Sequence, residues 1–301
     1  MNNGGLAAEH VSFSYAARLR GSRLGQPGSA RVLDDVSARI PRGGLVGILG
    51  PNGSGKTTLL RLLGGLLRPS AGRITLNDAD LHAIPRATIA RRIAMVPQET
   101  QLAFEYTVLE MATMGRYPHL RAFEIEGPED IDIAREALRV TGTQQLESRL
   151  FNTLSGGEKQ RVVIAGALAQ LDIRGREGFS GEQLENPSRP PMSDILLLDE
   201  PTASLDLAYQ LEIRSILQRL NHMRDLTIVV STHDLNFAAS LCRELVLLHQ
   251  GHVLAAGATE RMLEPTLIRQ LYGVEVDISA NPRTGQLTVI PVGRASDSPQ
   301  P

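Results

Sequence analysis

The sequence predicts a parallel α/β fold, in which a buried central sheet is covered by the helices that connect its strands. Short apolar runs alternate along the chain with segments of helical spacing, and this alternation is typical of parallel sheets with crossover helices. Several of the runs have the length of a strand and are bounded by glycine or polar residues, as central strands should be. They cover residues 44–50, 194–200, 226–232 and 244–251.

Length, composition and charge limit the classes of protein to which the chain can belong. Its 301 residues suffice for one large domain or two modest ones, and a hydrophobic content of 42% excludes disorder throughout. The formal net charge of −2 leaves no basic domain or stripe of the kind that binds nucleic acid. We therefore expect no nucleic-acid partner.

The sequence has no signal for secretion or membrane insertion. Its first residues lack a basic segment followed by an apolar run, and its apolar stretches fall short of the roughly 20 residues that a spanning helix needs. The single cysteine, Cys242, cannot form an internal disulfide, and we expect it to be a small buried residue on a helix. These features predict a cytoplasmic protein that reaches a membrane only through a partner.

Changes in pattern divide the chain into segments. We expect residues 5–98 and 166–250 to form the α/β core, and residues 99–165 to form an inserted, mostly helical subdomain. Residues 251–293, which contain short strand-like runs, are expected to form a C-terminal appendage. Stretches rich in glycine, serine, proline and charge predict flexible loops or disorder. These stretches are residues 18–31, the insertion 171–194 and the tail 294–301.

The strongest functional signal is the stretch GPNGSGKTT at residues 50–58. It contains the G-x4-G-K-[ST] pattern between a predicted strand and a predicted helix, which is the context of a phosphate-binding loop. Backbone N–H groups and the helix N-terminus would bind the phosphates of ATP, Lys56 would reach the β- and γ-phosphates, and the Thr57 hydroxyl would ligate Mg²⁺. The predicted nucleotide-binding residues are Gly50, Pro51, Asn52, Gly53, Ser54, Gly55, Lys56, Thr57 and Thr58.

Polar residues follow several of the predicted strands. Asp199 and Glu200 end the run ILLLDE, where Asp199 would hold Mg²⁺ and Glu200 would polarise the attacking water as a general base. Gln98 and His233 also follow apolar runs, and the carboxyl ends of parallel strands meet at one edge of a sheet. Each residue alone is an ordinary polar strand end. Together with Lys56 they indicate a nucleotide site.

A second glycine-rich element, LSGGEKQRV at residues 154–162, stands at a predicted helix start. With the motifs above, in their order along the chain, it makes the sequence from about residue 7 to about residue 290 resemble the nucleotide-binding domain of ATP-binding cassette (ABC) proteins. The LSGG element, with Gln160 and Arg161 after it, separates the chain from nucleotide kinases. The resemblance implies a phosphate-loop NTPase fold, with a RecA-like core, edge antiparallel strands and an inserted helical signalling subdomain.

The resemblance also implies roles for individual residues. Tyr15 would stack on adenine, Gln98 would contact Mg²⁺ and sense a permease, and His233 would contact the γ-phosphate. Asp206 would signal across a dimer. The signature loop would face the γ-phosphate of the ATP held by a second copy, because the first loop already supplies a helix N-terminus to its own ATP. The residues of this loop are Ser155, Gly156, Gly157 and Glu158.

Further stretches resemble the ATPases that power uptake of iron–siderophore complexes, haem and cobalamin: TVLEMATMGRYPH, LSGGEKQRVVIAGALAQ, THDLNFAA and LYGVEV. This implies an ATP-hydrolysing importer subunit that works as a dimer with transmembrane permease subunits and, indirectly, with a substrate-binding protein. It would lie at the cytoplasmic face of the cell (inner) membrane, held by the permease. The stretch MGRYPH would meet the permease; otherwise it is a plain helix end with Tyr117 packed and Pro118 stopping it.

Two other classes of phosphate-loop protein are alternatives. A soluble ABC ATPase that acts on a ribosome or on DNA usually has tandem cassettes or long coiled-coil insertions, whereas this sequence has one cassette and no heptad run. A phosphate-loop kinase would leave the LSGGE element unexplained. Residues 18–31 and 171–194 are longer than the corresponding parts of importer ATPases. Both segments lie between motifs. Because residues 171–194 would lie at the periphery, we expect them to leave catalysis unaffected; a regulatory or partner-binding use is the alternative.

Overall fold

The computed structural model describes residues 5–15, 31–100, 102–172, 194–203, 205–224 and 226–295. The expected loop 18–31, the insertion 171–194 and the tail 294–301 lie almost entirely outside these residues. The chain divides into two compact units: unit 1 comprises Met1–Ile40, Val46–His82 and Ser231–Pro301, and unit 2 comprises Pro41–Leu45 and Ala83–Val230. The domain limits expected from the sequence stay a prediction.

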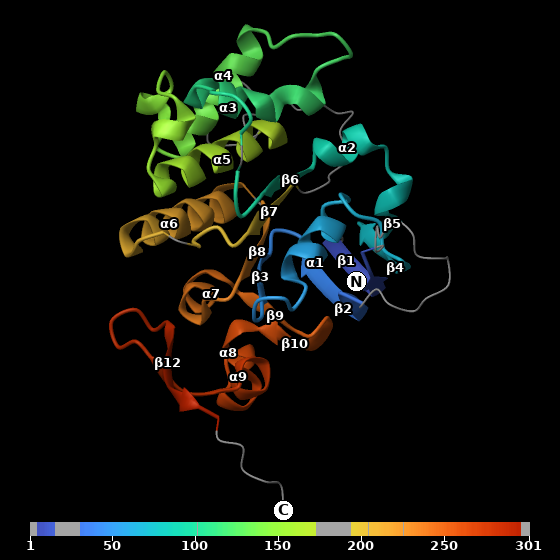
Figure 1. Ribbon diagram of the computed structural model, residues 1–301, viewed down its shortest axis with the longest axis vertical. Coiled ribbons are helices and arrows are strands. Elements are labelled where there is room, and N and C mark those ends of the chain that lie inside the picture. Colours follow the sequence, from blue (N-terminus) through green and yellow to red (C-terminus); the bar gives the residue numbers. More distant parts are fainter. Residues whose placement is uncertain are drawn as a thin grey trace, which may run out of the picture. The chain divides into compact units, whose positions relative to one another are not determined.

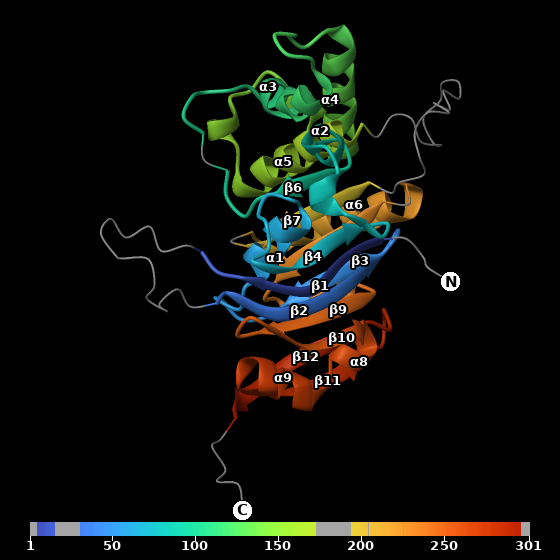
Figure 2. The same ribbon diagram turned by 90° about the vertical axis from the view of Figure 1, so that its right-hand side faces the viewer.

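An antiparallel sheet forms the first part of unit 1. Its strand order is β2–β1–β4–β5, with β1 at Gly5–Phe13, β2 at Leu33–Pro41, β4 at Ala71–Leu76 and β5 at Ala79–Asp80. β2 buries Val36, Ala38 and Ile40 and exposes the residues between them, which is the alternation of a strand with one face on a core. Figure 2 shows β1 and β2 running side by side. The edge antiparallel strands implied by the resemblance are therefore present.

A second group of strands in unit 1 leads into the phosphate loop. β3 (Leu45–Leu49) is fully buried and pairs in parallel with β9 (Glu244–His249). β10 (His252–Ala258) pairs antiparallel with β9. The loop after β3 ends at α1 (Lys56–Leu63), and η1 (Leu81–Ala83) follows β5. The apolar runs at 44–50 and 244–251 are thus strands, as predicted.

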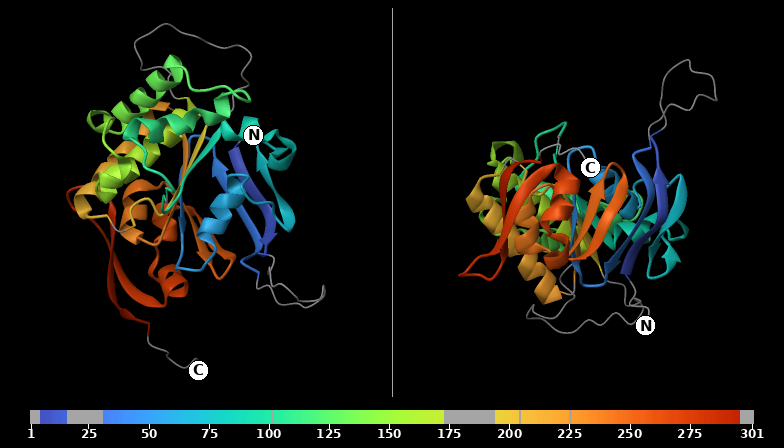
Figure 3. Two further views of the ribbon diagram at one scale, coloured as in Figure 1. Left: turned by 45° about the horizontal axis from the view of Figure 1, so that its top comes forward. Right: turned by 90° about the horizontal axis from the view of Figure 1, so that it is seen from below.

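The C-terminal part of unit 1 is built from short helices and a hairpin. The helices are α7 (Leu235–Leu241), α8 (Thr259–Met262) and α9 (Pro265–Tyr272), and the antiparallel hairpin consists of β11 (Val274–Ala280) and β12 (Leu287–Arg294). Figure 3 shows these elements in orange and red. The Asn236 amide of α7 donates to the Val289 carbonyl at 3.1 Å and accepts from the Val289 N–H at 2.8 Å. The hairpin is therefore fixed to α7.

The strands of unit 2 are also apolar and buried. β6 (Ile93–Val96) and β7 (Ile195–Asp199) are parallel, and β8 (Thr227–Thr232), whose first residues belong to this unit, is the next strand after β7. α6 (Leu207–Arg224) connects β7 to β8 along the chain. The runs 194–200 and 226–232 are therefore strands as predicted. The parallel pairs β3–β9 and β6–β7 confirm the predicted α/β class.

The rest of unit 2 is helical, as expected for the inserted subdomain. It contains α2 (Arg86–Ala90), α3 (Val108–Thr113), η2 (Met114–His119), α4 (Pro128–Val140), η3 (Gln144–Leu146), η4 (Phe151–Thr153) and α5 (Gly156–Leu171). Figure 1 shows α3, α4 and α5 together, in green. α4 begins at Pro128, because proline is well suited to the first helical position. Within the described ranges, no helix is long and apolar enough to span a bilayer.

Candidate functional site

The phosphate loop of unit 1 is shaped by glycine and by the start of a helix. Gly55 precedes α1 with a φ of 104°, a left-handed conformation that favours glycine. A Cβ atom at this position would lie 2.6 Å from the Cδ2 atom of Leu33 and 3.0 Å from the Val32 carbonyl oxygen, so a side chain here would also have to displace these neighbours. Among the residues described, none caps α1 with its side chain, and its first turn has no acidic residue. Because no carboxylate in this turn neutralises the positive end of the helix dipole, that end is suited to binding an anionic ligand.

Lys56 is buried within the loop that precedes it. Only 6% of its surface is exposed, and its ammonium group donates to the carbonyl oxygen of Gly50 at 2.9 Å and to that of Pro51 at 3.2 Å. The Ser54 hydroxyl is buried as well, and it has no hydrogen-bond partner within the described part of the chain. A buried cation and an unsatisfied hydroxyl in one loop fit a phosphate, whose oxygens can accept from both.

Tyr15 lies beside the helix that follows this loop. Its half-exposed ring packs edge-on against Phe13, with 4.9 Å between the ring centroids. Its hydroxyl lies 3.3 Å from the Thr58 hydroxyl of α1. The structure thus brings Tyr15 together with a predicted phosphate-loop residue. Stacking of its ring on adenine stays a prediction.

His233, the remaining predicted site residue of unit 1, is fixed through its backbone. Its neighbour Asp234 begins α7, and the Asp234 carboxylate accepts from the N–H groups of Asn236 and Phe237, both at 2.9 Å. The His233 carbonyl accepts from the Tyr272 hydroxyl of α9 at 3.3 Å. The exposed imidazole therefore stands on a segment that α7 and α9 both hold.

In unit 2, the predicted acidic residues stand where β7 ends. Asp199 and Glu200 are both buried. Glu200 has a φ of 48°, a strained conformation for a residue with a side chain, and such strain clusters at functional sites. Gln98 follows β6, the parallel neighbour of β7, in which Val96 lies opposite Leu198. The pairing therefore places Gln98 and the two carboxylates at the same sheet edge; their catalytic roles stay a prediction.

The expected Mg²⁺ ligands are oxygen donors of different kinds. Thr57 offers a hydroxyl, Gln98 an amide oxygen and Asp199 a carboxylate, and Mg²⁺ prefers oxygen ligands. Within the described ranges, no group of three or more His, Cys, Asp or Glu residues could hold a metal ion. Mg²⁺ commonly completes its coordination with phosphate oxygens and water, and its binding through these donors stays a prediction.

The signature loop of unit 2 forms the start of α5. The Ser155 hydroxyl accepts from the Glu158 N–H at 3.3 Å, and the Glu158 carboxylate accepts from the Ser155 N–H at 2.8 Å. These reciprocal bonds form a capping box. The hydrogen bond from the Ser155 N–H lowers the pKa of Glu158. The predicted helix start is confirmed, and the ionised Glu158 stabilises it.

Asp206 and Tyr209 lie at the start of α6. The Asp206 carboxylate accepts from the Tyr209 N–H at 3.1 Å. The Ser155 hydroxyl of the signature loop donates to the Tyr209 oxygen at 3.3 Å. Sequence reasoning missed Tyr209, because its contact arises from the packing of α6 against α5. Asp before a helical run predicts a cap, but no local pattern joins this tyrosine to residues more than fifty positions earlier.

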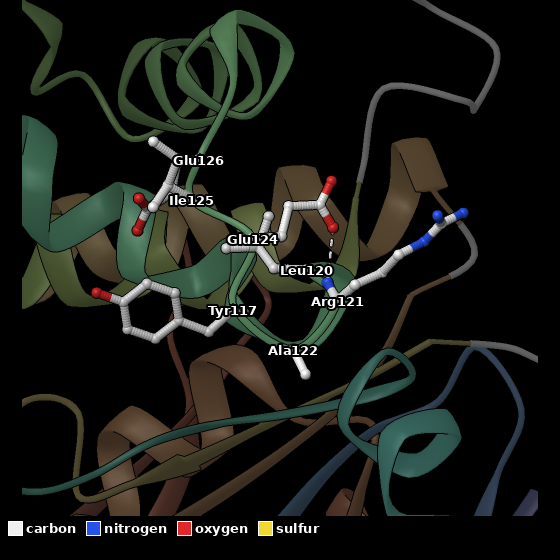
Figure 4. A pocket seen from close by; sticks show the side chains of 7 residues that line it. All are labelled: Tyr117, Leu120, Arg121, Ala122, Glu124, Ile125 and Glu126. Carbon is white, nitrogen blue, oxygen red and sulfur yellow. Dashed lines mark hydrogen bonds between the residues drawn. The ribbon is translucent and has the colours of Figure 1, made fainter.

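A hollow of about 470 Å³ lies next to η2 in unit 2. Its lining is Tyr117, Leu120, Arg121, Ala122, Glu124, Ile125 and Glu126 (Figure 4). Tyr117 is 55% exposed, so the alternative in which this tyrosine is packed at a plain helix end is wrong. Partial burial, followed by the charge of Glu126, raises the pKa of Tyr117. Figure 4 shows the Tyr117 ring near Glu126 and Ile125, with the Arg121 side chain pointing away.

The stretch MGRYPH is fastened to the C-terminal end of α5. Arg116 is 5% exposed; it donates to the Ala169 carbonyl at 2.9 Å and pairs with Asp130 at 2.9 Å and with Asp172 at 3.5 Å. The His119 ring lies 2.7 Å from the Gln170 carbonyl. Because the opposite end of α5 carries the signature loop, one helix connects η2 to that loop.

Comparisons with known proteins find several relatives along most of the chain. The family described as ABC transporter matches residues 33–171. The chain is 40% identical over 262 residues to the cobalamin import ATP-binding protein BtuD of Halobacterium salinarum, a match that covers 87% of this chain but 60% of that protein. It is 39% identical to the hemin import ATP-binding protein HmuV of Gloeobacter violaceus, over 88% of this chain and 90% of the relative. It is 35% identical to the iron(3+)-hydroxamate import ATP-binding protein FhuC of Bacillus subtilis, with 93% and 92% covered.

Solved structures give the same result. An inward-facing structure assigned to a metal-chelate type ABC transporter has a TM-score of 0.75 and 27% identity, and the match covers 96% of this chain and 98% of that one. A dimeric structure of a bacterial ABC transporter cassette has a TM-score of 0.67 and 27% identity, over 84% and 98%. The similarity therefore extends across both units and beyond the motifs.

Proposed function

Since the chain belongs to the ATP-binding subunits of ABC transporters, we propose that it hydrolyses ATP to drive uptake of an iron chelate, haem or cobalamin through a partner permease. The substrate classes follow from relatives named for cobalamin, hemin and iron(3+)-hydroxamate import. The soluble ABC ATPase and the kinase lack such support. The subunit would act at the cytoplasmic face of the cell membrane, held there by the permease, and would depend indirectly on a substrate-binding protein.

The phosphate loop is the observation that carries the proposal. In unit 1 the buried Lys56 ammonium is held by the carbonyl groups of Gly50 and Pro51, and the helix α1 begins at this residue. The triphosphate of ATP would replace these carbonyls as the partner of the ammonium group, because a charged acceptor makes a stronger hydrogen bond than a neutral one. Tyr15, at the side of α1, would receive the adenine ring.

Hydrolysis would depend on residues at the strand ends. Glu200 would accept a proton from the attacking water, His233 would orient the γ-phosphate, and Lys56 would stabilise the charge that develops on it. A Mg²⁺ ion held through Thr57, Gln98 and Asp199 would add Lewis-acid stabilisation of that charge. The strained backbone at Glu200 favours this assignment.

A second copy of the chain would complete each ATP site. The signature loop presents the Ser155 hydroxyl at the start of α5, and its own unit holds no phosphate loop. Asp206 and the exposed Leu207 and Leu211 lie at the start of the adjacent α6. Apolar side chains exposed beside a polar loop are typical of a surface that a partner covers. We therefore assign the signature loop to the ATP of the second copy.

The permease would bind at the hollow next to η2. Phe123 and Ile125 are fully or largely exposed there, and Tyr117 lines the same hollow. A cytoplasmic helix of the permease would bury these side chains. Arg116 and His119 fix η2 to α5, so a displacement of η2 would move the signature loop as well.

Reconstitution tests the proposed function. The chain is purified with a permease of the same organism, and the complex is placed in liposomes. ATP is added to the side of the membrane on which the chain lies, and uptake of ferric siderophore, haem and cobalamin is measured. We expect ATP-dependent uptake of one substrate class, and Glu200→Gln should abolish both uptake and hydrolysis while ATP stays bound. ATP hydrolysis without uptake of any of the three would contradict the importer assignment. Near-normal hydrolysis by Glu200→Gln would contradict the assignment of the base.

A further inference from the structure

Tyr209 is fixed at one end by the residue expected to signal between the two copies. Its N–H is donated to the Asp206 carboxylate at 3.1 Å. Tyr209 lies in the first turn of α6, and the Asp206 carboxylate caps the start of this helix. The position of the ring therefore depends on the segment that contains Asp206.

The ring of Tyr209 occupies the space that a side chain on Gly157 would need. A Cβ atom built on Gly157 would lie 2.2 Å from Tyr209 ring carbons, whereas one on Gly156 would come no closer than 3.4 Å to Leu205. The two glycines of the signature loop thus differ. Gly157 is required by the close approach of the tyrosine ring, even when no phosphate is considered.

Arg161 lies over the same ring. Its guanidinium carbon is 5.8 Å from the ring centroid of Tyr209, within the range of a cation–π contact. Its Nη1 pairs with the Glu212 carboxylate one turn further along α6, at 3.1 Å. The ring therefore packs against α5 at two positions one turn apart, Gly157 and Arg161.

The hydroxyl proton of Ser155 is used in a hydrogen bond to Tyr209. The Ser155 hydroxyl donates its single proton to the Tyr209 oxygen at 3.3 Å, and its own oxygen accepts from the Glu158 N–H. A serine hydroxyl has one proton to donate. Ser155 cannot bind a phosphate oxygen with this proton until it leaves Tyr209.

We propose that Tyr209 is a positioning residue that holds the Ser155 hydroxyl in the separated subunit and releases it to the γ-phosphate of ATP on a second copy. The exchange is favourable because the bond to an anionic oxygen is the stronger one. The contact with Tyr209 opposes closure, so it limits association of the two copies until ATP is present. This inference rests on the proposed role of the signature loop.

The test measures ATP-dependent association of the full chain, by sedimentation, in the Glu200→Gln background that retains ATP. Tyr209→Phe removes the hydroxyl and keeps the ring on Gly157, so we expect an unchanged melting temperature. Association should become roughly two- to tenfold tighter, the range expected for removing one competing neutral hydrogen bond. In a Ser155→Ala background the same substitution should have no effect, and Tyr106→Phe, outside the signature loop, should have none in either background.

Each other outcome has a defined meaning. Unchanged or weaker association of Tyr209→Phe would overturn the proposal, and so would an increase that persists without the Ser155 hydroxyl. Failure of the Glu200→Gln chain itself to associate with ATP would overturn the proposed role of the signature loop in the full chain, and the Tyr209 proposal with it.

Discussion

Lys56 is the residue on which nucleotide binding depends most directly. Its buried ammonium group is satisfied by two carbonyl oxygens, and no neutral side chain of similar size can provide the charge for a triphosphate. Hydrogen bonds to charged groups contribute about 1.5–3 kcal/mol each, so Lys56→Met should weaken ATP binding by roughly tenfold to a hundredfold. Titration with a fluorescent ATP analogue measures the affinity. Arg61→Met, an exposed change on the same helix, should leave it unaltered; equal affinities of the two variants would contradict the role of Lys56.

Cys242 gives a prediction about alkaline stability. The residue is buried at the end of α7, as expected from the sequence, and its desolvation raises the pKa of the thiol to about 12. The unfolded thiol has a pKa of roughly 8.5. The folded state therefore retains the proton at higher pH, and this contribution is fully present below the unfolded pKa and lost as the pH rises toward 12.

The measurement is denaturant unfolding of the wild type and of Cys242→Ala between pH 7 and pH 11. The free energy of unfolding of the wild type should fall by about 1.4 kcal/mol more per pH unit above the unfolded pKa than that of the variant. The folded thiol should also resist a thiol reagent at pH 8 and react after unfolding. Parallel pH profiles of the two proteins, or rapid labelling of the folded one, would contradict this account.

At the scale of elements, the connection between η2 and α5 depends on Arg116. Removal of one partner from a buried ion pair typically costs about 3–5 kcal/mol, and Arg116 bridges Asp130, Asp172 and a helix carbonyl. We expect Arg116→Met to lower the free energy of unfolding by that amount. Arg135→Met is the matched control, since Arg135 is 44% exposed and pairs only with Glu147 in the described part of the chain; it should cost about 1 kcal/mol or less. Equal losses would show that η2 is not held by the buried pair.

The same pair predicts a dependence on acid. Burial raises the pKa of Asp130, but hydrogen bonds from Arg116 and from the Gly127 N–H, together with the charge of Arg116, lower it by more. The stabilisation is therefore present above the unfolded pKa of roughly 3.9 and lost as the pH falls below it. Between pH 5 and pH 3, the free energy of unfolding should fall less for Arg116→Met than for the wild type. A profile parallel to that of the wild type would contradict the pairing.

How far the sequence predicts each element depends on whether its pattern is local. The strand in ILLLDE and the strand–loop–helix order around residues 50–58 are confirmed, because both patterns depend on neighbouring residues. The partner of β10 was not predicted: GHVLAAG reads as a short strand, but its pairing with β9 depends on residues brought together by the fold. The Tyr209 contact with Ser155 was missed for the same reason.

MGRYPH shows the limit of such reasoning within one stretch. Proline near its end predicts a stop, yet Pro118 lies inside a 3-10 turn that runs through His119. Tyr117 is exposed, whereas Arg116 is buried, because Arg116 reaches carboxylates on α4 and after α5. The sequence alone does not indicate which of Arg116 and Tyr117 is buried, because their burial depends on helices more than ten residues away along the chain.

For the whole molecule, the central claim is that one chain cannot complete its own ATP site. Its phosphate loop belongs to unit 1 and its signature loop to unit 2, and we propose that the second loop serves the ATP of another copy. The proposed importer function requires it, because association and separation of two copies would provide the movement that drives a permease.

ATP-dependent association of Ser155→Arg in the Glu200→Gln background tests this claim most directly. The arginine would crowd the signature loop but leave the phosphate loop of the same chain untouched, so the affinity of the monomer for ATP should be unchanged while ATP-dependent dimers disappear. Gln144→Arg, which adds the same charge in η3 of the same unit, should still form dimers. If Ser155→Arg instead loses ATP affinity as a monomer, or forms dimers as readily as Gln144→Arg, the signature loop serves its own chain and the account is wrong.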